Sequence, residues 1–214
     1  MPGNFSMLNA DEQIRKRIMK QIVTHTRTQL QFPRPPAELR GYVAALMDVF
    51  GCKDLFTRPE LNFVREAFVA AKVGIIRDAS SAALIDAARP DFELRVASRT
   101  ELYELVEADT LDRRRSDEYK AGNRIQHWPE PTSGEEAFRL IHKAAKAKAK
   151  KAAELIAKGT PYPNETRLLF YLNHIWNFGG SDDEIEIIFS AAVEPARKWF
   201  SSIWLLWKEA VYQV

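Results

Sequence analysis

The sequence predicts an α/β protein in which a mixed sheet is flanked by helices and preceded by a helical appendage. In some segments apolar residues recur every three to four positions, and in others they alternate or run together. These are the patterns of amphipathic helices and of strands. From residue 57 onward the two kinds of segment follow one another along the chain, an order typical of folds in which helices cover a sheet.

Residues 1–56 are expected to form the helical appendage. Isoleucines at every fourth position predict an amphipathic helix over residues 11–30. The prolines at 33–36 end this helix, because proline lacks a backbone donor and disfavours helix before it. A second helix is predicted over residues 37–50, with Gly51 as its C-terminal cap.

The α/β domain is expected to cover residues 57–214. Thr57 and Glu60 have the spacing of a capping box, which predicts a helix from here to about Ala71. Three strands should follow, the last two of them forming a hairpin: residues 73–77, 92–96 and 102–108.

The second half of this domain alternates between helix and strand. Residues 113–131 are polar and bounded by proline, which predicts a loop. Ser133 is expected to cap a long helix over residues 135–158, and Gly159 follows the last turn of that helix. A strand, a helix and a strand complete the chain: residues 168–172, 183–198 and 203–207.

The composition excludes several classes of protein. Apolar residues make up 46% of the chain and charged residues 28%, which excludes collagen-like and wholly disordered proteins. The net charge is only +2, from 31 basic and 29 acidic residues, so any surface that attracts nucleic acid must be local. The single cysteine, Cys52, cannot form an internal disulfide.

The sequence also sets an expectation for the location of the protein. No stretch approaches the roughly 20 apolar residues of a membrane span. The first residues lack the basic-then-apolar order of a secretory signal. We therefore expect a cytoplasmic protein without a membrane partner.

Two acidic residues of the predicted hairpin are candidates for a metal site. Alternation places Glu104 among apolar neighbours on one strand face, where an unpaired carboxylate is costly. Asp91 opens the preceding strand, and a short hairpin can bring the two carboxylates together. Two carboxylates and a backbone carbonyl suit Mg²⁺, which can activate water for phosphodiester hydrolysis. The alternative is a surface hairpin with solvated acids.

The chain from residue 57 to 214 resembles the PD-(D/E)XK nuclease superfamily. The resemblance is carried by Pro90-Asp91, a hairpin and then Glu104-Leu105-Val106, placed between a helix with acidic residues and a long helix. It implies the restriction-endonuclease-like fold in a protein of bacterial or phage type. It also implies that the partner is a nucleic acid, with DNA preferred over RNA.

The resemblance assigns roles to individual residues. Asp91 and Glu104 would bind the divalent metal, Mg²⁺ or Mn²⁺. An acid on the first helix of the domain, Glu66 or Glu60, would assist them. The capping box already explains Glu60, so Glu66 is the preferred candidate.

The chain departs from the superfamily at one position. There, a lysine two positions after the glutamate polarises the attacking water, and here that position holds Val106. One alternative is that the lysine has moved to the long helix, where Lys143, Lys146 and Lys150 share a face. Lys143 would then be catalytic, and Lys146 and Lys150 would contact phosphates.

Two further alternatives stay open for the missing lysine. Glu107 or Asp109 supplies the polar group, although alternation puts both on the opposite strand face from Glu104. Alternatively, hydrolysis has been lost, because valine can neither donate a hydrogen bond nor stabilise charge. The protein would then be a catalytically inactive module of the same fold that binds nucleic acid or another protein.

A cluster of three arginines is the best candidate for a nucleic-acid contact. Arg113, Arg114 and Arg115 follow the hairpin directly, and arginine forks suit phosphate oxygens. The arginines could instead pair with neighbouring acids, and the helix lysines could form an ordinary solvated face. A different hypothesis is a structural oligomer, such as a homodimer, built through the N-terminal helices.

Overall fold

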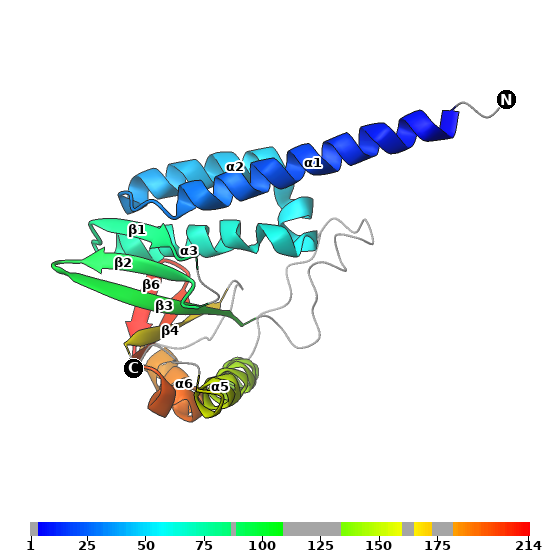
Figure 1. Cartoon of the computed structure of the whole chain (residues 1–214). Helices are drawn as coiled ribbons and strands as arrows, with labels where there is room; N and C mark the ends of the chain where they lie inside the picture. Colours follow the sequence, from blue (N-terminus) through cyan, green and yellow to red (C-terminus); the bar gives the residue numbers. More distant parts are fainter. Residues whose placement is uncertain (1–3, 87–88, 109–133, 160–164, 173–181) are drawn as a thin grey trace.

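The computed structural model describes residues 4–86, 89–108, 134–159, 165–172 and 182–214. A sheet lies between two layers of helices (Figure 1), so the α/β class with a mixed sheet flanked by helices is confirmed. The helices are α1 (Asn4–Leu30), α2 (Pro36–Thr57), η1 (Pro59–Leu61), α3 (Asn62–Ile76), α5 (Gly134–Ala157), α6 (Asp182–Ala192) and η2 (Glu194–Trp199). The strands are β1 (Ser81–Leu84), β2 (Phe92–Val96), β3 (Arg99–Glu107), β4 (Thr166–Leu172), β5 (Ser202–Trp207) and β6 (Ala210–Gln213).

The six strands lie in the sheet in the order in which they occur in the chain. The β1–β2, β2–β3 and β5–β6 pairs are antiparallel, whereas β3–β4 and β4–β5 are parallel. Parallel neighbours need a crossover connection, and α5 and α6 lie in these two connections. Both crossovers step the same way along the sheet, so their common handedness places both helices on one face.

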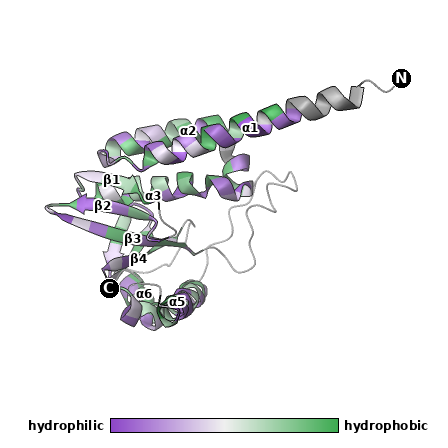
Figure 2. Ribbon diagram, viewed as in Figure 1, coloured by the Kyte–Doolittle hydropathy of each residue, from purple (hydrophilic) through white to green (hydrophobic). Residues whose placement is uncertain are grey.

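Two hydrophobic cores lie on the two faces of the sheet. On β4, Leu169 belongs to the core under α1, α2 and α3, while Leu168 and Phe170 belong to the core under α5, α6 and η2. This division follows from the alternation of side chains along a strand. Figure 2 shows α3 in mainly hydrophobic colours between α2 and the sheet.

The two N-terminal helices share the core of α3 and the sheet. Leu30, Leu39 and Val43 are fully buried in it. Between the helices, the backbone of Arg34 forms two hydrogen bonds with Ala82 of β1, at 3.2 and 2.9 Å. The N-terminal half of α1 extends beyond α2 (Figure 1). Thus the segment expected as an appendage is joined to the α/β layers by common packing.

The predicted strand at residues 73–77 is wrong. These residues form the last turn of α3 and the residue after it, where Val73 and Gly74 continue the buried stripe of Ala70 at helical spacing. The strand that precedes the hairpin is β1, whose Ser-Ala-Ala-Leu sequence has little β-propensity. Its place in the sheet comes from pairing with β2.

The predicted capping box is also wrong. The hydroxyl of Thr57 donates to the carbonyl of Lys53 at 2.9 Å, so this residue closes α2 instead of opening the next helix. Glu60 accepts from Arg58 at 3.0 Å. The chain then passes through η1 into α3.

Other boundaries differ from those expected. The helix predicted over 183–198 ends at Ala192 and is followed by η2, which has Pro195 in its first turn, where proline is well tolerated. The strand β6 was not predicted. The predicted loop at 113–131 and the cap at Ser133 lie outside the described residues. Within the described part, none of the helices is both long and apolar enough to cross a membrane.

Gly51 is the point at which α2 is kinked. Its backbone has φ 72° and ψ 155°, a region that only glycine adopts without strain. The sequence predicted a helix end here, and the structure shows a kink followed by another helical turn. Leu55, in that turn, is buried, so its packing stabilises the helical turn beyond the kink.

Replacing Gly51 by alanine should therefore destabilise the protein. We expect Gly51→Ala to lower the free energy of unfolding by about 1–3 kcal/mol, the cost of a strained backbone. Gly41→Ala is the matched control, since Gly41 lies inside the regular part of the same helix. An added Cβ meets no atom within 4 Å at either position. The control should raise stability by about 0.5–1 kcal/mol; equal effects of the two variants in urea unfolding would contradict the assignment.

Candidate active site

The candidate site lies where β3 extends beyond β2. β3 pairs with β2 over residues 99–103 and with β4 over residues 102–107. Among the described residues, the rest of the β2-side edge of β3 has no strand partner. There the carboxylate of Asp91 accepts a hydrogen bond from the Leu105 N–H at 2.6 Å. Groups from both helical layers can reach the sheet at this point.

The strand register brings Asp91 beside Glu104. Phe92 pairs with Tyr103, and the two acids are the next residues on the same side of this pair. The Asp91 N–H donates to the Tyr103 carbonyl at 2.8 Å. Both acids line one pocket of about 260 Å³, together with Asn62, Arg65, Glu66, Arg89, Leu105, Glu107 and Lys148.

Glu104 is the most buried acid of this pocket. Only 2% of its side chain is exposed. Its Oε1 atom accepts from the Lys148 ammonium at 2.5 Å and lies 3.5 Å from Nε of Arg89. Its Oε2 atom is buried and has no hydrogen-bond partner within the described ranges. Two cations thus approach one oxygen of this carboxylate, while the other oxygen is buried without a hydrogen-bond partner in the described part of the chain.

A lysine of the long helix does reach Glu104, but it is Lys148. Lys148 lies on the buried stripe of α5, at helical spacing with Ile141, Ala145 and Ala152. The small alanines on either side leave room for its ammonium to approach the sheet. The sequence contained this signal, a single lysine within an apolar stripe, and the prediction of Lys143 overlooked it.

The structure does not bring the three predicted lysines to the pocket. Lys143, Lys146 and Lys150 are all exposed, and Lys150 lies 3.9 Å from Glu154 on the surface. Lys148 lies five positions after Lys143, which places the two side chains on different sides of a helix with 3.6 residues per turn. Lys143, Lys146 and Lys150 therefore lie on the outer face of α5. The phosphate contacts expected of Lys146 and Lys150 stay predictions.

Glu66 reaches the pocket from α3, on the other helical layer. Burial raises the pKa of its carboxyl to about 7, and the charge of Asp91 acts in the same direction. Burial also raises the pKa of Asp91, as does the neighbouring Glu104, against the effect of the Leu105 amide. Glu60, the other candidate on this side, is exposed and paired with Arg58.

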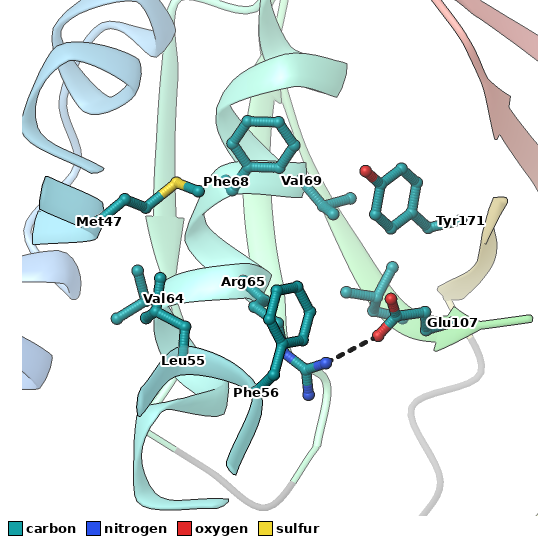
Figure 3. A pocket seen from close by; sticks show the side chains of 10 residues that line it. Met47, Leu55, Phe56, Val64, Arg65, Phe68, Val69, Glu107 and Tyr171 are labelled. Atoms are coloured by element: carbon teal, nitrogen blue, oxygen red, sulfur yellow. Dashed lines mark hydrogen bonds and ion pairs between the residues drawn. The ribbon is translucent and has the colours of Figure 1, made fainter. Parts of the chain in front are cut away.

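Arg65 and Glu107 form the side of the pocket next to α3. Their ion pair has a length of 3.0 Å (Figure 3), and Arg65 also donates to Asn62 at 2.8 Å. Glu107, which was one candidate for the missing polar group, is therefore held by a cation of α3. Asp109 and the three arginines, Arg113, Arg114 and Arg115, lie outside the described residues.

The donor set of the pocket fits a hard divalent cation. In the part of the chain that the structure describes, no three His, Cys, Asp or Glu side chains are grouped to hold a metal ion by themselves. Mg²⁺ commonly binds through one or two carboxylates and keeps several waters, which substrate phosphates can replace. Asp91 and the unpartnered Oε2 of Glu104 provide such a pair.

Comparisons with protein-family models, curated proteins and solved structures found no match to this chain. A functional assignment therefore rests on the geometry and chemistry of the pocket itself.

Replacing Glu66 by glutamine should change how stability depends on pH. The pKa of Glu66 is raised to about 7 in the folded protein and is near 4.3 in an unfolded chain, so the folded state binds the proton more tightly. Stability of the wild type therefore falls as pH rises from about 4.5 to about 7. Glu66→Gln avoids this loss, and at pH 8 we expect it to be more stable by about 1–3 kcal/mol.

Urea unfolding in EDTA from pH 3 to pH 8 measures this difference. Below pH 4 the two proteins should be equally stable, because both side chains are then neutral. Glu60→Gln is the control, because a backbone hydrogen bond and Arg58 lower the pKa of Glu60, and it should bring no gain at pH 8. Parallel curves for the wild type and Glu66→Gln would show that Glu66 titrates normally.

Proposed function

We propose that the protein is a metal-dependent nuclease with a restriction-endonuclease-like fold, which hydrolyses phosphodiester bonds of nucleic acid with Mg²⁺ or Mn²⁺. One observation carries the proposal. Glu66, Asp91, Glu104 and Lys148 come from four separate segments and line a single pocket. Three carboxylates and an ammonium around one space are the groups that metal-assisted phosphodiester hydrolysis needs.

The order of elements supports the same assignment. The acidic helix α3 precedes the hairpin β2–β3, and α5 then leads into β4, parallel to β3. This is the order on which the sequence resemblance to the PD-(D/E)XK superfamily depends. The pocket lies at the open end of the hairpin, where Asp91 and Glu104 meet.

Each of the four residues has a role that follows from its surroundings. Asp91 and Glu104 would hold the metal, which when bound lowers the pKa of a water molecule and offsets phosphate charge. Lys148 donates one N–H to Glu104, and its other N–H groups can orient the attacking water. Glu66, with a pKa of about 7, can accept the proton of that water at neutral pH.

The bonds in this reaction balance without a further reactant. The water oxygen forms a bond to phosphorus, and one P–O ester bond breaks. The products are a phosphate monoester and a free hydroxyl group. The proton lost by water goes to a carboxylate, and the leaving oxygen takes a proton from solvent.

The alternative is a catalytically inactive module that binds nucleic acid or protein. Its support is Val106, which occupies the position of the superfamily lysine and is buried in the core beneath α5. Lys148 weighs against this alternative, because it places an ammonium at the same carboxylate from another element. Four carboxylates line the pocket against three cations, and a site that only bound nucleic acid would gain nothing from an excess of negative charge, which repels phosphate.

A nuclease assay with three site variants tests the proposal. Substrates are supercoiled plasmid, linear duplex, single-stranded DNA and RNA, each with Mg²⁺, Mn²⁺ or EDTA. Asp91→Asn, Glu104→Gln and Lys148→Met should each lower the cleavage rate by at least about a hundredfold, since each removes a group that acts on the reacting phosphate or water.

Lys143→Met is the matched control for Lys148→Met, because it makes the same change on the exposed face of the same helix. It should keep the wild-type rate. Loss of activity in Lys143→Met alone would return the catalytic role to that residue. Binding without cleavage of any substrate by the wild type would support the inactive module instead.

The arginine cluster provides a separate prediction about binding. Replacing Arg113, Arg114 and Arg115 by alanine should weaken binding to nucleic acid and flatten its salt dependence. Each lost phosphate contact lowers the slope of log affinity against log salt by about 0.7 to 0.9. Titrations at several salt concentrations measure this slope, with Lys16→Ala on α1 as control. An unchanged slope would mean that the arginines pair with neighbouring acids.

A further inference from the structure

A second pocket adjoins the candidate active site, and it differs in character. Its volume is about 190 Å³, and it lies between α2, α3 and the ends of β3 and β4 (Figure 3). Three aromatic side chains, Phe56, Phe68 and Tyr171, contribute to its wall, and most of the other lining side chains are apolar. An apolar cavity of about 150 Å³ accommodates a benzene ring, so this pocket has room for a planar ring.

The two pockets share a wall. Arg65, Leu105 and Glu107 line both of them. An occupant of the apolar pocket is therefore separated from the acidic pocket by a single layer of side chains. A ligand that filled both pockets would need two parts joined by a short link. One part would be planar and apolar, and the other would bind a metal ion held by the carboxylates.

The shared wall is also the polar part of the apolar pocket. In it the Arg65 guanidinium donates to the Glu107 carboxylate at 3.0 Å. The Arg65 side chain is 35% exposed. A guanidinium has five N–H donors, and Glu107 and Asn62 accept two of them. A ring with acceptor atoms on its edge could accept a further N–H of Arg65, which a purely hydrocarbon ligand could not do.

We propose that the apolar pocket binds one unpaired base of the nucleic-acid substrate, so that the protein prefers single-stranded or locally unpaired substrates. This inference rests on the proposed function. A nucleotide joins a planar ring with polar edges to a phosphate through one sugar, and this matches the pair of pockets. A base inside a duplex is stacked and paired, and it must leave the stack to enter such a pocket.

The pocket supplies what an unstacked base requires. Aromatic side chains replace the neighbouring bases of the stack, an interaction that tolerates any sequence. The pocket therefore predicts selection by strand state and not by sequence.

Binding measured with Ca²⁺ tests this inference separately from hydrolysis, because Ca²⁺ takes oxygen ligands as Mg²⁺ does and offsets the acids that repel phosphate. Fluorescence anisotropy, with a gel to check that the probes stay intact, compares three labelled probes: a strand of twelve thymidines, a strand of twelve abasic sugar-phosphates and a blunt duplex of twelve base pairs. The thymidine and abasic strands carry equal charge and differ only in their bases. We expect the thymidine strand to bind about tenfold or more tightly than either of the others.

A variant that fills the pocket should remove this preference. Met47 lines the pocket and is 36% exposed, so Met47→Trp can fill the space without a change in the deep core. Val49→Trp is the control on the same helix, at a side chain that is 75% exposed and outside the pocket. Met47→Trp should bind the thymidine strand only as tightly as the abasic strand, whereas Val49→Trp keeps the wild-type preference.

Phe68→Ala provides a second variant should Met47→Trp fail to fold. It removes one aromatic wall and should lose the same preference. Equal binding of the thymidine and abasic strands by the wild type would overturn the inference, as would equal behaviour of Met47→Trp and Val49→Trp. Hydrolysis of plasmid in Mg²⁺ without a base preference would leave the proposed function intact and overturn only the base pocket.

Discussion

Burying the carboxylate of Glu104 in the sheet interior costs more free energy than a hydrogen bond returns, unless cations accompany it. Much of the local architecture supplies these cations. Lys148 comes from α5 and Arg89 from the segment before β2, and both approach the same oxygen. The second oxygen is left without a partner within the described part of the chain.

The strand β3 connects this charge to the rest of the fold. Its alternate residues serve different layers: Tyr103 packs under α3, and Val106 packs under α5. A lysine at position 106 would lie among the apolar side chains of the second core, where a charged group is disfavoured. The helix that covers this core can provide the ammonium instead. Val106 thus keeps this core apolar, and Lys148 brings the ammonium to Glu104 from the helix.

Sequence patterns predicted the elements that carry strong periodicity. The long helix, the hairpin and the buried strands β4 and β5 were all found within a few residues of their ends. β1 was missed because Ala82 and Ala83 have little preference for strands, and their place is set by pairing across the sheet. Val73 was assigned to a strand because an apolar run of this length fits a strand as well as a buried helix.

The acids of the site were easier to predict than its cation. Asp91 and Glu104 are placed by strand alternation and hairpin length, which are local properties. The role of Lys148 depends on which face of α5 packs on the sheet. Several exposed lysines on the same helix made it hard to single out from the sequence. The Arg65–Glu107 pair joins residues 42 positions apart, so no local pattern could reveal it.

The backbone contact between Arg34 and Ala82 has a consequence for how the sheet meets other molecules. β1 is an edge strand, and an edge strand with free N–H and C=O groups can pair with a strand of another chain. Here the N–H and C=O of Ala82 are both occupied by the turn between α1 and α2. A foreign strand would have to displace that turn, together with the buried Leu30 and Leu39 that anchor its two ends. A segment of the same chain thereby covers one edge of the sheet and protects it against aggregation.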